Sequence, residues 1–145
     1  MQSNQIHVHR AVEEIVETGR KRVGLLGFSF KAGTDDLRES PLVILAEVLL
    51  GKGYQLRIYD RNVSLARLVG ANRQYIEEQI PHLSALLRTH VEEVIDESDV
   101  VVVGNASPEF SEAVLRCRED QVVLDLVRIP IDFARLAAEY RGICW

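Results

Sequence analysis

The spacing of apolar residues along the chain predicts an alternation of helices with short buried strands. Residues 3–18 carry apolar side chains at helical spacing with glutamates turned away, so we expect an amphipathic helix that ends at Gly19. Four short apolar runs are typical of strands buried on both faces. These runs are residues 23–27, 54–59, 100–103 and 122–127.

Helical patterns fill the intervals between these runs. Ser40 is a typical N-cap and Pro41 a typical first helical residue, so we expect a helix over 41–50. This helix is apolar almost all round, and we therefore expect it to be deeply packed. Further helices are predicted over 63–87 (interrupted at Gly70 and Pro81), 91–97, 107–116 and 132–139, with a short last strand around Ile143.

Strands that alternate with helices indicate right-handed crossovers and a parallel sheet. The predicted fold class is α/β: a Rossmann-like open parallel sheet with helices on both faces, preceded by one N-terminal helix. That leading helix stands outside the repeat. Its apolar stripe therefore needs another surface, which a further domain or a second subunit could provide.

Composition narrows the class of protein. The chain has 145 residues, 47% of them hydrophobic, and a net charge of −5, which fits one folded domain and argues against disorder. The acidic balance argues against nucleic acid or anionic membrane as a partner. Without an apolar run near the length of a membrane span or a signal-peptide pattern, we expect a soluble, cytoplasmic chain. Two cysteines exclude a disulfide scaffold and a cysteine zinc site.

Candidate chemistry lies where parallel strands end, in loops that begin at Gly27, Asp60, Gly104 and Arg128. The loop 27–41 is neither a GxGxxG fingerprint nor a Walker A loop. It places Lys31 and Arg38 beside a helix N-terminus, an arrangement that suits a pyrophosphate. Alternatively, these two cations only neutralise the acidic residues of a solvated loop, namely Asp35, Asp36 and Glu39.

The same loop carries a family resemblance. Its sequence, GFSFKAGTDDLRESP at 27–41, is similar to the FKxxTxDxRxSP signature of the UDP-glucose/GDP-mannose dehydrogenase family, which follows the first strand of that family's C-terminal domain. The similarity extends through the segment YDRN at 59–62 to GICW at 142–145, and so covers essentially the whole chain. The loop variant and the C-terminal segment look more like the GDP-mannose 6-dehydrogenase branch.

The resemblance implies a fragment of a larger enzyme. Residues 1–19 would be the end of the central dimerisation helix, and residues 20–145 the C-terminal nucleotide-sugar-binding domain. Full members hold NAD mainly in an N-terminal domain and oxidise the sugar C6 alcohol to a carboxylate in two hydride transfers, through a cysteine thioester. The implied partners are GDP-mannose or a related sugar nucleotide, the NAD domain, and a second copy in a homo-oligomer. Enzymes of this branch typically feed alginate, a polysaccharide.

Transferred residue by residue, Lys31 would hold the sugar nucleotide and Arg38 would reach the nicotinamide cofactor of the other domain. Phe30 could pack on the base or sugar, or simply belong to the core. UDP-sugar relatives carry an Asp-x-Arg substrate contact after the fourth strand. Here Arg128 stands one residue late, and in a strand one residue changes the face.

Catalytic and metal residues are not expected in this chain. The family nucleophile lies in a Gly-x-Cys-x-Pro-Lys-Asp segment that the sequence lacks, so Cys117 and Cys144 are interpreted as ordinary thiols and the chain alone as inactive. The four dispersed histidines suggest no metal site. Asp60 is either a ribose-binding acid or a turn residue. Two other functions stay open: a UDP-glucose 6-dehydrogenase domain, or an assembly module that binds no ligand.

Overall fold

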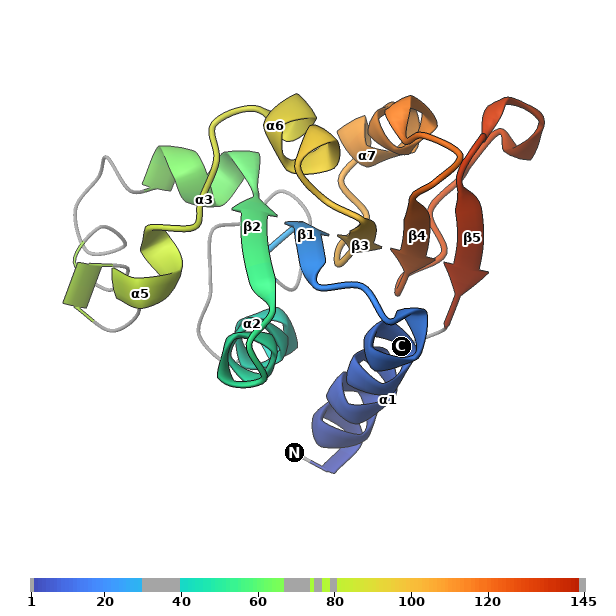
Figure 1. Ribbon diagram of the computed structural model, residues 1–145. Helices are drawn as coiled ribbons and strands as arrows, with labels where there is room; N and C mark the ends of the chain where they lie inside the picture. The colour runs from blue at the N-terminus through green and yellow to red at the C-terminus, as the bar shows by residue number, and fades with distance from the viewer. Residues whose placement is uncertain (1, 30–39, 67–73, 75–76, 79–80, 144–145) are drawn as a thin grey trace.

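Five parallel strands form one open sheet in the order β2-β1-β3-β4-β5 (Figure 1). The computed structural model describes residues 2–29, 40–66, 74, 77–78 and 81–143. The strands are β1 (Arg22–Leu26), β2 (Gln55–Tyr59), β3 (Val100–Val103), β4 (Val122–Asp125) and β5 (Glu139–Gly142). The parallel α/β sheet predicted from the sequence is therefore confirmed. Its order reverses between β1 and β3, the point at which doubly wound folds bind ligands.

Helices cover both faces of the sheet, as predicted. They are α1 (Gln2–Thr18), α2 (Pro41–Gly51), α3 (Arg61–Ala66), α5 (Pro81–Ser84), α6 (Val91–Asp96) and α7 (Glu109–Ala113), with 3-10 turns η1 (Val114–Arg116) and η2 (Phe133–Arg135). In Figure 1, α1 and α2 lie below the sheet, and α6 and α7 lie above it. Strand β3 shows why both faces are apolar. Val100 and Val102 belong to the core under α1 and α2, whereas Val101 and Val103 belong to the core under α6 and α7.

Helix α2 begins as the sequence predicts. Ser40 is its N-cap and accepts a hydrogen bond from the Leu42 N–H, while Pro41 occupies the first turn, where its missing N–H costs nothing. Because apolar residues surround α2 almost completely, the sequence predicted that it is deeply packed. This prediction is confirmed for only one side of the helix. Leu42, Leu45 and Leu49 are buried, but Ile44 stays 43% exposed.

Helix α1 packs on this domain itself, which corrects the expectation that its stripe needs another domain or subunit. Ala11 and Ile15 are fully buried in the same core as α2 and the lower face of the sheet. The Arg141 guanidinium of β5 pairs with Glu14 of α1 at 3.4 Å, so the first helix and the last strand are joined. Val16 alone of the predicted stripe is half exposed.

The C-terminal part departs most from the prediction. Instead of a helix over 132–139, the chain forms the short turn η2 and then enters β5, which runs over Glu139–Gly142 rather than around Ile143. Pairing with β4 decides this, because the Glu139 N–H donates to the Gln121 carbonyl and extends the sheet. The predicted strand 122–127 also ends early, at Asp125, whose carboxylate accepts the N–H groups of the next turn.

The predicted helical stretch 63–87 is only partly described. Helix α3 starts at Arg61 and α5 starts at Pro81, where an interruption was predicted, but residues 67–73, 75–76 and 79–80 lie outside the described residues. Helices predicted over 91–97 and 107–116 are confirmed as α6 and as α7 with η1. Within the described part of the chain, every helix is too short or too polar to cross a membrane.

Candidate functional site

The loop that carries the resemblance is described only at its two ends. Phe30, Lys31 and Arg38, the residues predicted to bind substrate and cofactor, lie outside the described residues. The structure does describe Phe28 and Ser29, where the chain leaves β1, and Ser40, where it returns at α2. The Ser40 hydroxyl donates to the Phe28 carbonyl at 2.8 Å, so the two ends of the loop are tied to each other.

Asp60 organises the start of this loop. It follows β2 directly, and the residue is 3% exposed. Oδ2 accepts the N–H of Phe28 at 2.8 Å and both the N–H and the hydroxyl of Ser29 at 3.1 and 3.2 Å. Oδ1 accepts the N–H groups of Asn62 and Val63 at 3.0 and 3.3 Å. One carboxylate thus holds the loops after β1 and β2 together, as a turn residue rather than a ribose-binding acid.

Asn105 adds the loop after β3 to the same cluster. Its amide nitrogen donates to the Ser29 carbonyl at 3.0 Å and to Asp60 Oδ2 at 3.4 Å, and its oxygen accepts the Ser107 N–H. A Cβ atom on Gly27 would lie within 2.9 Å of the Asn105 amide atoms, which is too close for any side chain. Gly27 also has a φ of +96°, a backbone conformation that favours glycine. Only glycine fits there, both sterically and conformationally.

This geometry leaves no Rossmann-type dinucleotide site among the described residues. The acid after β2 that would bind a ribose already accepts main-chain donors, and Asn105 fills the space above Gly27 at the switch point. The described residues of this cluster therefore do not form a site for NAD. Any nicotinamide cofactor has to be held chiefly by residues beyond this cluster.

A second buried carboxylate shapes the loop after β4. Asp125 is fully buried and accepts the N–H groups of Val127, Arg128 and Ile129, together with the Tyr140 hydroxyl at 2.9 Å. Burial, followed by this hydrogen bond, raises the pKa of Tyr140 to about 12.

Arg128 is held in the left-handed region by this turn, with a φ of 57°, which is rare for an arginine. Arg128 is exposed, beyond the carboxyl end of β4. Since β4 ends at Asp125, Arg128 is not a strand residue, and strand alternation does not decide where its side chain points. An exposed guanidinium at this position can pair with a phosphate or a carboxylate.

The remaining candidates are structural. Cys117 is buried, and burial raises the pKa of its thiol to about 12, so it is a poor nucleophile. Cys144 lies outside the described residues. His9 pairs with Glu13, His82 faces Glu47, and no metal-ligating cluster occurs in the described part of the chain.

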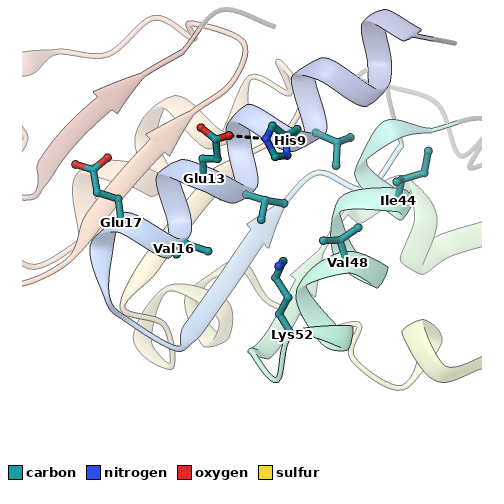
Figure 2. A pocket seen from close by; sticks show the side chains of 9 residues that line it. His9, Glu13, Val16, Glu17, Ile44, Val48 and Lys52 are labelled. Carbon is teal, nitrogen blue, oxygen red and sulfur yellow. Dashed lines mark ion pairs between the residues drawn. The ribbon is translucent and has the colours of Figure 1, made fainter.

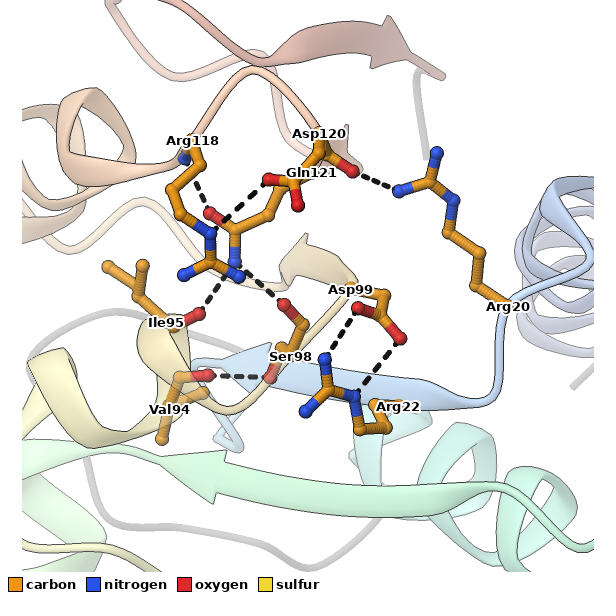
Figure 3. A network of polar contacts seen from close by, with 9 residues as sticks. All are labelled: Arg20, Arg22, Val94, Ile95, Ser98, Asp99, Arg118, Asp120 and Gln121. Carbon is orange, nitrogen blue, oxygen red and sulfur yellow. Dashed lines mark hydrogen bonds and ion pairs between the residues drawn. The ribbon is translucent and has the colours of Figure 1, made fainter.

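A network of polar contacts lies at the amino ends of the strands, opposite the loops described above (Figure 3). The Gln121 amide donates to the carbonyls of Ile95 and Ser98, both at 2.7 Å, and Arg22 pairs with Asp99 through two contacts. These bonds join the amino ends of β1, β3 and β4. The Gln121 amide is buried, whereas the Arg22–Asp99 pair is exposed, and each of these donors is matched by an acceptor.

An apolar groove of about 520 Å³ lies between α1 and α2 (Figure 2). Val8, Val12 and Val16 of α1 face Ile44 and Val48 of α2 across it. His9, Glu13, Glu17 and Lys52 form its polar rim. None of Phe28, Ser29, Asp60 and Asn105 lines the groove, so it is a surface distinct from the loop cluster.

Sequence reasoning missed Asn105, Ser29 and Tyr140. One signal was available for the first of these. Asp60, Asn105 and Asp125 each stand at or just after the end of a strand, where side chains of neighbouring loops meet. The partners of each group come from distant segments, so their pairing could not be read from the chain.

Known proteins resemble this chain over its whole length. Residues 24–130 match the model of the UDP-glucose/GDP-mannose dehydrogenase family, UDP binding domain. GDP-mannose 6-dehydrogenases of Pseudomonas putida and Pseudomonas aeruginosa are 50% and 51% identical over all 145 residues. A UDP-glucose 6-dehydrogenase of Rickettsia felis is 29% identical over 111 residues, which is 77% of this chain and 22% of that protein.

Solved structures agree. A ternary complex of GDP-mannose dehydrogenase from P. aeruginosa superposes with a TM-score of 0.89 at 51% identity, covering 100% of this chain and 33% of that one. A UDP-glucose dehydrogenase from Pyrobaculum islandicum gives 0.65 at 26% identity, covering 99% and 30%. The chain spans about a third of the length of the Pseudomonas relatives. It therefore belongs to the UDP-glucose/GDP-mannose dehydrogenase family and carries that family's UDP binding domain.

Proposed function

We propose that this chain is the sugar-nucleotide-binding C-terminal domain of an NAD-dependent GDP-mannose 6-dehydrogenase, which converts GDP-mannose to GDP-mannuronate by two hydride transfers. The observation that carries the proposal is the contrast in identity. GDP-mannose 6-dehydrogenases match at 46–51% over the whole chain, against 28–29% over 111 residues for UDP-glucose 6-dehydrogenases.

In this proposal, residues 1–19 are the end of the central dimerisation helix and 20–145 the binding domain. Lys31 gives a charge-assisted contact to the sugar nucleotide, with Phe30 and Arg128 as further substrate contacts. Arg38 reaches the nicotinamide of NAD held by another domain. These residues position the substrate, and the chemistry is done elsewhere.

The chain alone is expected to be inactive. Its sequence lacks the nucleophile segment, and Cys117 is buried with a raised pKa, so it cannot replace the missing cysteine. No detectable NADH formation with GDP-mannose is the expected result. Turnover by the chain alone would overturn this part of the proposal.

The experiment that tests binding is an NMR titration of the labelled chain with GDP-mannose, UDP-glucose and NAD in turn. We expect shifts at the amides of Phe28, Ser29 and Asn105 with GDP-mannose and none with NAD. Shifts with UDP-glucose alone would favour the UDP-glucose 6-dehydrogenase alternative. No shift with either sugar nucleotide would contradict the function.

Lys31→Ala tests the assignment of the key contact. We expect binding of GDP-mannose to weaken about ten-fold or more, because a hydrogen bond between charged groups is lost. Stability should change by less than about 0.5 kcal/mol, because the proposal assigns this lysine to the ligand rather than to the core. Lys52→Ala, at the rim of the α1–α2 groove, is the matched control and should leave binding unchanged. Equal affinities for wild type and Lys31→Ala would refute the assignment.

A second candidate function is that of an assembly module, and the α1–α2 groove favours it. Val16 and Ile44 leave 49% and 43% of their surface exposed on facing helices. Covering such apolar surface with a second copy would stabilise an oligomer. Sedimentation of the chain tests this, with Ile44→Glu as the variant expected to abolish association. A wild-type chain that sediments as a monomer at high concentration would rule out self-association.

A further inference from the structure

The carboxylate of Asp60 is buried, satisfied and placed at the point where three strand-end loops meet. It accepts hydrogen bonds from six donor groups of the described residues: three after β1, two in the first turn of α3 and one from Asn105 after β3. A charged acceptor makes each of these bonds stronger than a neutral one would. The carboxylate therefore fixes the three loops relative to one another.

The bonds to Phe28 and Ser29 matter most for function. They set the direction in which the chain leaves β1, and Lys31 follows only two residues after Ser29. Asn105 braces the same point from the other side, through the Ser29 carbonyl.

We infer that Asp60 is a positioning residue for sugar-nucleotide binding, acting through the main chain of Phe28 and Ser29 rather than by touching the ligand. This inference rests on the proposed function, because it assumes that the loop after Ser29 binds the sugar nucleotide. It assigns to the acid after β2 a role different from the ribose contact of dinucleotide folds.

The decisive variant is Asp60→Asn. The asparagine keeps the size of the side chain but replaces one acceptor oxygen with an NH₂ group. That group cannot accept a hydrogen bond from a main-chain N–H, whichever of the two oxygens it replaces. We expect the affinity for GDP-mannose to fall about ten-fold or more, since bonds to a charged acceptor at the loop base are lost. We also expect the amide proton signals of Phe28 and Ser29 to move upfield in the ligand-free chain.

Gln121→Ala is the matched control. Gln121 is equally buried and makes two side-chain bonds to carbonyls, but at the amino edge of the sheet. It should lower the melting temperature without changing GDP-mannose affinity by more than about two-fold, at a temperature where the chain is fully folded. A merely structural role for Asp60 would give the same pattern as this control.

Asn105→Ala keeps the inference testable if Asp60→Asn does not fold. It removes the brace to Ser29 while leaving the main-chain bonds of Asp60 in place, and a smaller loss of affinity, about three-fold or more, is expected. If the folded variants bind GDP-mannose as tightly as wild type does, the positioning role is wrong while the proposed function stands. If wild type itself does not bind, the proposed function fails and takes this inference with it.

Discussion

At the scale of single residues, the strand ends of this domain are shaped by carboxylates that bind the protein's own main chain. Asp60 and Asp125 are both buried, and both accept N–H groups from the turn that follows them. A buried carboxylate without such donors would be strongly destabilising. The consequence is that both carboxylates are occupied by donors of the protein itself.

Burial of Tyr140, together with its hydrogen bond to Asp125, makes the stability of the chain fall at alkaline pH. Because the pKa of Tyr140 is raised to about 12 in the folded chain, its contribution is complete below pH 10 and is lost as the pH rises from 10 towards 12. We expect Tyr140→Phe to lower the free energy of unfolding by about 1–2 kcal/mol at neutral pH, because Asp125 loses a hydroxyl donor. Urea unfolding at a series of pH values measures the difference between the two proteins. That difference should shrink above pH 10, and a constant difference would contradict the assignment.

At the scale of elements, α2 matters because its N-terminus closes the loop that carries Lys31 and Arg38. Ser40 is buried and works in two directions, donating to the Phe28 carbonyl and accepting from the Leu42 N–H. The start of the helix and the end of β1 are thus joined through one hydroxyl. This contact fixes the C-terminal end of the loop at Ser40, and Asp60 fixes its N-terminal end at Phe28 and Ser29.

Ser40→Ala should therefore destabilise the chain by about 1–2 kcal/mol, through loss of a helix cap and of a buried hydrogen bond. Asp132→Ala is the matched control, because Asp132 caps only the exposed turn η2, where its carboxylate accepts the Ala134 N–H. The control should cost less than about 0.5 kcal/mol. Chemical denaturation of both variants checks the ranking, and equal losses would show that the link to Phe28 adds nothing.

At the scale of the whole molecule, α1 is part of the domain's core as well as one wall of its outer groove. Ile15 is fully buried against α2 and the sheet, whereas its neighbour Val16 is half exposed beside the groove. The same helix therefore presents one face inward and one edge outward. A fragment starting at β1 would expose part of the lower core, including the apolar side of α2.

Two neighbouring substitutions test this placement. Ile15→Ala should lower the free energy of unfolding by about 2–5 kcal/mol, because it opens a cavity in the core. Val16→Ala should change it by less than about 0.5 kcal/mol in the monomer. Thermal melts of the two variants at low concentration provide the measurement. Similar, small effects would mean that α1 does not pack on this domain.

The sequence by itself determined the order and type of most elements, because helical and strand periodicity are local properties of the chain. It also determined the family, through the loop 27–41. Among the predicted site residues, Phe30, Lys31 and Arg38 lie outside the described residues, so their roles stay predictions. Arg128 is placed at the expected edge of the sheet, and its role also stays a prediction.

Only the tertiary structure decided which surface covers α1, where β4 ends, and that residues 132–139 extend the sheet rather than form a helix. It also decided the role of Asp60. The physical reason is that each outcome depends on partners far away in sequence. The donors to Asp60 come from Phe28 and Ser29 on one side and from Asn105, 45 residues further on, on the other. No local pattern records which donors will meet a carboxylate once the strands have aligned.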